Sequence, residues 1–161
     1  AGYHTILDLH SYGHDIETAW LLDHGVKVLG DEAYETKIGP ITQALAAHIY
    51  ETAFDGHSLA NECDRDVVNT HRVWWVQAET VVGFLNAYEQ MPDHSEYRDA
   101  ALAEWQFIKE HVIDPRRGSE WYWEVYEDGS PILDRPIVEP WKCPYHNGRM
   151  CIEVLGRIKE N

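Results

Sequence analysis

The sequence predicts a mainly helical fold, and three observations support this prediction. Apolar residues recur at helical spacing in five segments. Two stretches with strand-like turn chemistry divide these segments in the order helix pair, excursion, helix pair, excursion, helix. No low-complexity linker interrupts the 161 residues, a length typical of one domain. We therefore expect a single helical domain over 1–161 or one piece of a helical repeat, and the unpaired fifth helix and abrupt start favour the piece.

The first two helices form the first pair. The first is expected over 15–30, where Ile16 and Trp20 belong to a broad apolar face. The second is expected over 35–54, again with apolar residues at helical steps. Pro40 falls near its start, where proline is tolerated, or else it marks a kink.

The second pair and the last helix follow the same pattern. Helices are expected over 73–91 and 95–113, with Ser95 as the N-cap of the latter. The fifth is expected over 147–161. The excursions are 55–72 and 119–134. In the second, alternating bulky residues precede an Asp-Gly pair, which predicts a β-hairpin.

Charge and composition narrow the classes of function. A formal net charge of −15 opposes binding to nucleic acid and to anionic membranes, because both require a basic surface. No run of 18 apolar residues is present, so no membrane span is expected. Seven Trp and nine Tyr against three Phe favour rings that bury one face and still hydrogen-bond, which suit a core or a sugar-binding surface. Three irregularly spaced cysteines and the absence of signal-peptide features in the opening residues predict a cytoplasmic protein.

The segment SYGHDIETAWLL contains the first cluster of chemically useful side chains. In a helix that begins near Gly13, the residues His14, Glu17 and Trp20 follow one another in steps of three and share one face. The positive end of the helix dipole would keep such a histidine neutral and basic. Spacing alone leaves two interpretations open: a site with a base, a carboxylate and an indole, or a structural histidine beside a core tryptophan.

The segment RVWWVQAETVVGF places Trp75 and Glu79 one turn apart on a helix that otherwise looks buried. A buried carboxylate needs a partner, because burial of an unpaired charge is costly. Arg72 or a hydroxyl group of a ligand could be that partner. A structural ion pair and a ligand-binding carboxylate therefore both remain open.

The segment EPWKCPYHNGRMCIE precedes and enters the last helix. A nucleophilic dyad of Cys143 and His146, oriented by Asn147, is disfavoured because catalytic thiols usually meet their histidine from a distant segment. A zinc site needs convergent ligands at spacings such as H-x-x-x-H or paired C-x-x-C, and we expect no metal here. The best local hypothesis is His146 as an acid or base beside the indole of Trp141. Arg149 would pair with an acid or contact a ligand.

Three segments together, in this order, resemble the signature segments of cellobiose 2-epimerases, which belong to the N-acylglucosamine 2-epimerase superfamily. They are SYGHDIE at 11–17, WWVQAE at 74–79 and WKCPYHNGRMC at 141–151. The resemblance runs through the whole chain and includes the EWYWEVYEDGSP hairpin. It implies an all-α fold, the (α/α)6 barrel, in which a ring of helix hairpins surrounds a central site. Five helices are under half of such a ring, so the chain resembles its C-terminal part.

The resemblance also implies a reaction. Members of this group invert C2 of the reducing-end glucose of a β-1,4-linked disaccharide by ring opening, removal of the C2 proton and reprotonation of a cis-enediolate on the other face, with no cofactor. Two acid–base groups are needed on opposite sides of C2, and histidine suits this task near neutral pH. By resemblance these are His14 and His146, and His146 also assists ring opening. Glu17 and Glu79 would orient the imidazoles or bind sugar hydroxyls.

The tryptophans receive roles by the same resemblance. Trp141 would stack on the second sugar, whereas Trp20 and Trp75 would shape the pocket. Cys143 and Cys151 are expected to be packing residues beside the loop. The expected partner is an oligosaccharide or disaccharide substrate.

Rival functions remain open because the family also uses polar residues from the earlier half of the ring. One rival is a mannobiose, N-acylglucosamine or monosaccharide 2-epimerase or isomerase of the same superfamily. Another is a sugar-binding helical domain that is catalytically incomplete. An incomplete ring would expose apolar helix faces, so self-association is expected.

Overall fold

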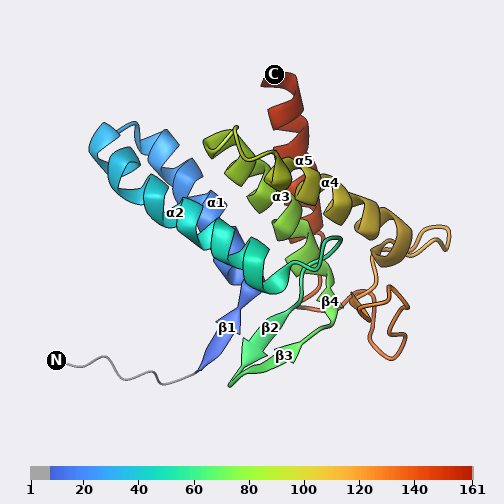
Figure 1. The fold of residues 1–161 in the computed structure, drawn as a ribbon. Coiled ribbons are helices and arrows are strands. Elements are labelled where there is room, and N and C mark those ends of the chain that lie inside the picture. The colour runs from blue at the N-terminus through green and yellow to red at the C-terminus, as the bar shows by residue number, and fades with distance from the viewer. Residues whose placement is uncertain (1–7, 161) are drawn as a thin grey trace.

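The computed structural model describes residues 8–160, and five α-helices dominate it (Figure 1). Two helix hairpins lie side by side, and the fifth helix packs on the second hairpin. All five expected helical segments are confirmed, with boundaries that differ by a few residues. The helices are α1 (Tyr12–Leu29), α2 (Glu32–Ala53), α3 (Trp74–Gln90), α4 (Ser95–Phe107) and α5 (Tyr145–Glu160).

The α1–α2 connection is short because each helix end carries its own stop signal. Gly30 adopts the left-handed conformation (φ 66°), and its N–H donates to Val26 at 3.0 Å, which closes α1. Asp31 then caps α2 by accepting a hydrogen bond from the N–H of Ala33 at 2.9 Å. The second helix continues through Pro40, which marks neither its start nor its end.

Helix α3 is central and packs against α1, α4 and α5. It approaches α1 most closely where Gly83 faces Ile16, since a Cβ atom on Gly83 would overlap that side chain. Helix α4 begins at Ser95, but its N-cap is His94 and no side chain caps it, so the predicted Ser95 cap is wrong. A short π-helix, η1 (Ile108–Val112), extends α4 to cover the rest of the predicted segment.

Short strands occupy the excursions. The first excursion forms β2 (Glu62–Asp64) and β3 (Val67–Asn69), which pair with β1 (Leu9–Ser11) in the antiparallel order β1-β2-β3. Strand β4 (Arg72–Val73) pairs instead with β5 (Glu124–Val125). The predicted Asp-Gly turn is present, because the N–H of Tyr126 donates to Ser130 at 2.9 Å. Its flanks meet in a single bridge, Val125 to Pro131, rather than in a two-stranded hairpin.

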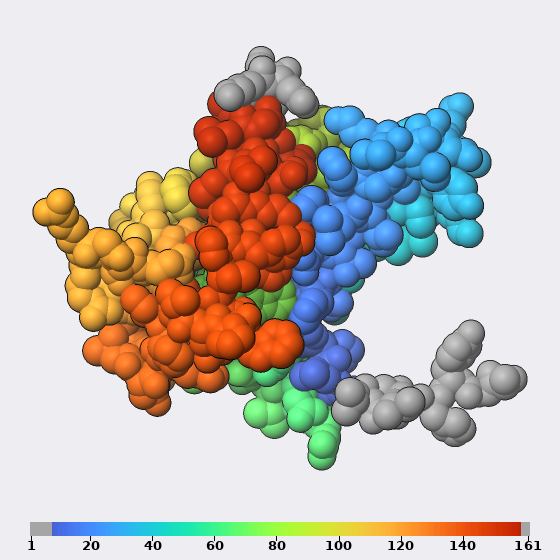
Figure 2. Space-filling view, turned by 180° about the vertical axis from the view of Figure 1, so that it is seen from behind, coloured from blue at the N-terminus to red at the C-terminus, as the bar shows by residue number. Residues whose placement is uncertain are grey.

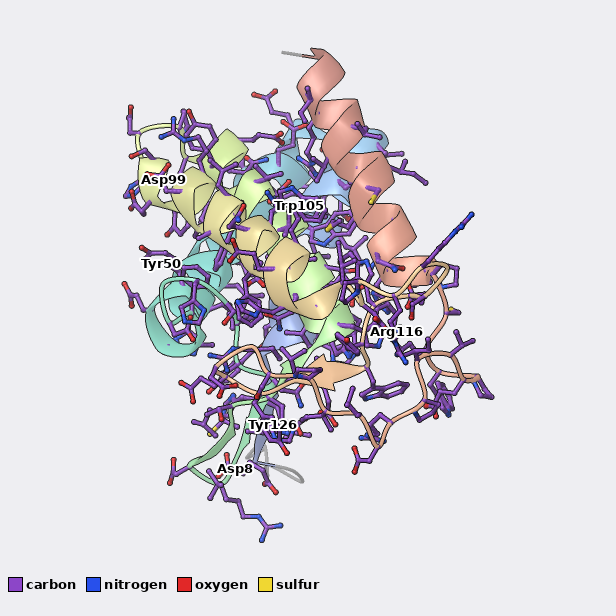
Figure 3. All side chains as sticks on the ribbon, turned by 90° about the vertical axis from the view of Figure 1, so that its right-hand side faces the viewer. Asp8, Tyr50, Asp99, Trp105, Arg116 and Tyr126 are labelled. Carbon is purple, nitrogen blue, oxygen red and sulfur yellow. The ribbon has the colours of Figure 1, made fainter. Side chains whose placement is uncertain are left out.

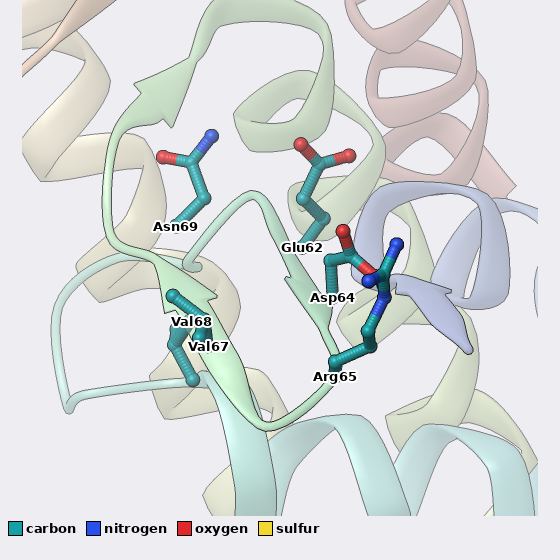
Figure 4. Close-up of a pocket in the computed structure, with 6 residues that line it drawn as sticks. All are labelled: Glu62, Asp64, Arg65, Val67, Val68 and Asn69. Carbon is teal, nitrogen blue, oxygen red and sulfur yellow. The ribbon is translucent and has the colours of Figure 1, made fainter. Parts of the chain in front are cut away.

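The described residues form two hollows of note. One, of about 460 Å³, is lined by residues of the β2–β3 hairpin (Figure 4). The other, of about 280 Å³, is an apolar groove between α3, α4 and α5. Trp105 lies between α4 and α5 at this groove (Figure 3).

Within residues 8–160, no helix combines the length and apolar character that crossing a membrane requires.

Candidate active site

Glu79 is the centre of a polar cluster that joins three helices. It lies in the second turn of α3, and its side chain is 1% exposed. Its Oε2 accepts from the indole N–H of Trp20 at 3.0 Å. Its Oε1 lies 2.7 Å from Nδ1 of His146 and accepts from Nη2 of Arg149 at 2.7 Å. The buried carboxylate predicted from the sequence therefore has partners from both α1 and α5.

Arg72 is not one of these partners. Its guanidinium donates to Asp55 and, at 2.8 Å, to the hydroxyl of Ser58. The suggestion that Arg72 neutralises Glu79 is wrong, because Arg72 lies in β4 before α3 begins and turns toward the end of α2. The true partner, Arg149, was left unassigned by the sequence.

Arg149 connects the two acidic side chains of the cluster. It donates to Glu17 as well as to Glu79. Its guanidinium lies 5.0 Å from the ring of Trp20 and 4.5 Å from that of Tyr145, whose hydroxyl accepts a hydrogen bond at 2.6 Å. Burial would lower the pKa of Arg149, but the hydrogen bonds and charges of Glu79 and Glu17 raise it above its usual value. The cluster therefore holds a permanent positive charge.

His14 and His146 both pack against one indole, that of Trp75. The ring centroid of Trp75 is 4.6 Å from that of His14 and 5.4 Å from that of His146. A glycine at position 13 permits this packing, since a Cβ atom there would lie 2.6 Å from Cη2 of Trp75. The two histidines, 132 positions apart in the sequence, thus share one aromatic platform on α3.

Each imidazole is held through its Nδ1 atom. Nδ1 of His14 is 2.7 Å from the hydroxyl of Ser11, and Nδ1 of His146 is 2.7 Å from the Glu79 carboxylate. In a neutral imidazole, this carboxylate favours the tautomer with the proton on Nδ1, in which Nε2 is an acceptor. Both histidines occupy the first turn of a helix, α1 or α5.

Trp141 lies apart from the buried cluster, at the tip of a tight turn. The backbone groups of Glu139 and Lys142 bond to each other, at 3.0 and 3.3 Å, and this turn presents Trp141 with 85% of its surface exposed. Trp20, in contrast, is buried and contacts Glu79 and Arg149. Cys143 and Cys151 are also exposed, so their expected packing role is wrong: the loop turns outward at Cys143, and Cys151 lines the open groove.

Three side chains of the kind that bind metal ions come together in the cluster, although their spacing in the sequence did not predict this. Donor atoms of Glu17, Glu79 and His146 lie within 4.8 Å of one another. The guanidinium of Arg149 bonds to both of these carboxylates. The sequence also holds His10 and His14 at H-x-x-x-H spacing, but α1 begins at Tyr12 and His10 lies in β1, so the two are not on successive helical turns.

The structure therefore brings six of the seven predicted site residues into one cluster. The seventh, Trp141, lies at an exposed tip five positions before His146 in the chain. Sequence analysis missed the residues that hold the loop, namely Glu120, Lys142 and Asn147. Asn147 donates to Glu120 at 2.6 Å, so it does not orient His146 as the thiol-dyad hypothesis required. No sequence signal marked them, because Lys142 is buried between the exposed residues Trp141 and Cys143.

A helical scaffold with paired histidines and carboxylates at the helix starts is the type of site that performs acid–base chemistry on a carbohydrate, and comparison with known proteins agrees. The N-acylglucosamine 2-epimerase (GlcNAc 2-epimerase) family profile matches residues 9–147. The chain belongs to this family.

Individual relatives are more specific. The chain is 50% identical over 153 residues to a cellobiose 2-epimerase of Eubacterium cellulosolvens and 46% identical over 155 residues to that of Ruminococcus albus. These matches cover 95% and 96% of this chain but 37% and 40% of the relatives. The chain thus spans about two-fifths of their length.

Solved structures show the same relation. A sugar epimerase from a ruminal bacterium superposes with a TM-score of 0.92 at 46% identity, covering 96% of this chain and 39% of that one. The cellobiose 2-epimerase of Bacillus thermoamylovorans gives 0.86 at 44% identity with the same coverage. A D-mannose isomerase gives 0.76 at 28% identity, covering 91% and 37%. The predicted fold, part of an (α/α)6 barrel, is confirmed.

Proposed function

We propose that this chain carries the acid–base pair of a sugar 2-epimerase that acts on the reducing-end glucose of a β-1,4-linked disaccharide. The observation that carries the proposal is the packing of His14 and His146 against the same indole, that of Trp75, which brings two acid–base groups to one place. Inversion at C2 requires one group to remove a proton and another to return it from the opposite face. The similarity to cellobiose 2-epimerases supports the choice of reaction.

The residues then take separate tasks. One imidazole accepts the C2 proton of the open-chain sugar through Nε2, because its Nδ1 is engaged by Ser11 or by Glu79. The other imidazole returns a proton to the resulting cis-enediolate, and His146 also assists ring opening. Arg149 donates to both Glu17 and Glu79 and so fixes these two carboxylates beside the imidazole of His146. Trp141 stacks on the second sugar.

The test is the exchange of the C2 proton. Cellobiose is incubated with the chain in D2O and followed by proton NMR, beside the variants His146→Asn and His24→Asn. His24 is an exposed histidine of α1 and serves as the matched control. Deuterium at C2 and accumulation of the mannose epimer are expected with the unmodified chain and with His24→Asn. His146→Asn should lose about 100-fold or more in rate, the usual contribution of a positioned acid or base.

Other outcomes would separate the rivals. Undiminished exchange by His146→Asn would remove this residue from the mechanism. Faster exchange with mannobiose, mannose or N-acetylglucosamine than with cellobiose would redirect the assignment within the superfamily. Binding of cellobiose without exchange would make the chain a sugar-binding unit rather than an enzyme.

A further inference from the structure

The loop 137–146 carries two proposed functional side chains but has few contacts of its own. Trp141 is 85% exposed at the tip of the tight turn, and His146 lies in the first turn of α5, which begins at Tyr145. The mutual position of a stacking surface and an acid–base group sets which part of a sugar each one meets. Something must therefore hold the loop relative to α3, which carries Glu79 and Trp75.

An ion pair connects this loop to the rest of the chain through Lys142 and Glu120. The side chain of Lys142 is 0% exposed, and its ammonium group donates to Glu120 and, at 2.9 Å, to the carbonyl of Ile137. It also lies 5.0 Å from the ring centroid of Trp74, the first residue of α3. The ammonium group of Lys142 thus contacts three other parts of the chain: Glu120, the loop residue Ile137 that precedes the turn, and Trp74 of α3.

The same carboxylate reaches the start of α5. The second oxygen of Glu120 accepts from the side-chain amide of Asn147 at 2.6 Å, next to His146 in the chain. Trp74 meets His146 edge to face, with ring centroids 5.4 Å apart. Lys142 and His146 are therefore connected by two routes, one through Glu120 and Asn147 and the other through Trp74.

Stability alone is a weak reason for this arrangement. Buried ion pairs add little net stability, because the loss of hydration offsets the attraction, and an apolar residue of similar size often fills such a place equally well. A hydrogen-bonded ion pair instead fixes the relative position of its two groups, because each hydrogen bond forms only within a narrow range of distances and angles.

We infer that Glu120, Lys142 and Asn147, here termed the loop anchor, are positioning residues that fix Trp141 and His146 relative to Glu79. The inference deepens the proposed function and rests on it. None of the three residues touches the reacting atoms. Their effect passes through the turn that presents Trp141 and through the first turn of α5.

The test compares two buried ion pairs of the same kind. Lys142→Met and Glu120→Gln remove the ion pair of the loop anchor, and Asp55→Asn removes the ion pair of Arg72 with Asp55. The exposed fractions match, since the cation and carboxylate are 0% and 28% exposed in the first pair and 2% and 27% in the second. All three variants are expected to lower the melting temperature, so stability alone does not distinguish them.

Two readouts do distinguish them. Nitrogen-15 NMR of the imidazole of His146 and of the indole of Trp141 should show shifted or broadened signals in Lys142→Met and Glu120→Gln and unchanged signals in Asp55→Asn. In the exchange assay, kcat/KM for cellobiose should fall about 10- to 100-fold in the anchor variants, as expected for a displaced catalytic group, and stay unchanged in Asp55→Asn.

The NMR readout needs no turnover, so it decides the inference even if the unmodified chain proves inactive. Unchanged His146 and Trp141 signals in Lys142→Met, at a loss of stability equal to that of Asp55→Asn, would overturn it. Should Lys142→Met fail to fold, Glu120→Gln remains decisive, because glutamine keeps the size of the side chain and can still accept from Asn147.

Discussion

Glu79 and Glu104 are both buried carboxylic acids, and their surroundings differ. Glu79 has Trp20, His146 and Arg149 as partners. Neither oxygen of Glu104 has a hydrogen-bond partner among the described residues. Complete burial raises the pKa of Glu104 well above its usual value, and the charge of nearby Arg72 opposes this only in part. Glu104 therefore prefers its neutral form in the folded chain.

This preference makes stability depend on pH in a definite direction. A carboxyl group with a higher pKa in the folded state binds its proton more tightly there, so its contribution is fully present below about pH 4.3, the usual glutamate value, and is lost as pH rises toward the raised pKa. Glu104→Gln keeps the shape and cannot ionise. Denaturant unfolding from pH 4 to 8 should show that the unmodified chain loses stability relative to this variant as pH rises. Parallel curves would contradict the assignment.

Residues of the site were predictable to different degrees. His14, Glu17 and Trp20 follow from helical spacing, because neighbours on one face of a helix stay together in the fold. The partnership of Glu79 with Arg149 joins positions 70 apart in the sequence and depends on how α3 and α5 pack. Periodicity carries no information on such a contact. For this reason the sequence suggested only Arg72, which is near in the chain, or a ligand hydroxyl as the partner, and Arg72 is not one.

At the scale of elements, α3 is the platform on which α1 and α5 place their polar groups. Its contact with α1 is close because Gly83 has no side chain at the point where Ile16 packs. This close approach brings Trp20 within hydrogen-bonding distance of Glu79. The spacing of the helices and the geometry of the site are therefore linked through one glycine.

Replacement of that glycine tests the link. Gly83→Ala should destabilise the chain by about 1–3 kcal/mol, because the added methyl group must displace Ile16 or separate the two helices. Gly25→Ala in α1 is the matched control: a Cβ atom there meets nothing within 4 Å, so a gain of about 0.5–1 kcal/mol is expected. Chemical denaturation gives both values. Equal effects of the two substitutions would show that α1 and α3 are not closely packed.

The elements themselves were predictable where local chemistry determines them. Long apolar periodicity gave all five helices, and the Asp-Gly turn appeared where expected. Apart from the hairpin expected in 119–134, the strands were not assigned from the sequence, because each has only two or three residues and β1, β4 and β5 each pair with a partner distant in the chain. The π-helix after α4 had no signal either. Ser95 failed as a cap since the helix begins at this residue rather than after it.

At the scale of the whole molecule, one face that includes α5 exposes apolar side chains. Figure 2 shows α5 lying across this face, with α1 on one side and α4 on the other. Ile152, Leu155 and Ile158 of α5 are each more than half exposed, as are Val28 and Leu29 at the end of α1. The apolar groove between α3, α4 and α5 adjoins them. Surfaces of this kind favour association with another apolar surface.

We therefore expect the isolated chain to self-associate through α5. Sedimentation velocity should show a mass that increases with protein concentration, and Leu155→Glu should shift the distribution toward the monomer, because a charge on the apolar face must be desolvated in the contact. Glu62→Gln, in the β2–β3 hairpin away from α5, is the control. A monomer at all concentrations would contradict the expectation.

The exposure of Trp141 has a further consequence, for spectroscopy. Of the seven tryptophans, all within the described residues, only this one is exposed; the others are buried or partly buried. Its indole is therefore the one most accessible to a quencher dissolved in water. With a net charge of −15, a cationic quencher such as caesium should reach this indole more readily than iodide. A sugar ring stacked on it would exclude the quencher and shift the emission to the blue, so the chain contains its own optical reporter of sugar binding.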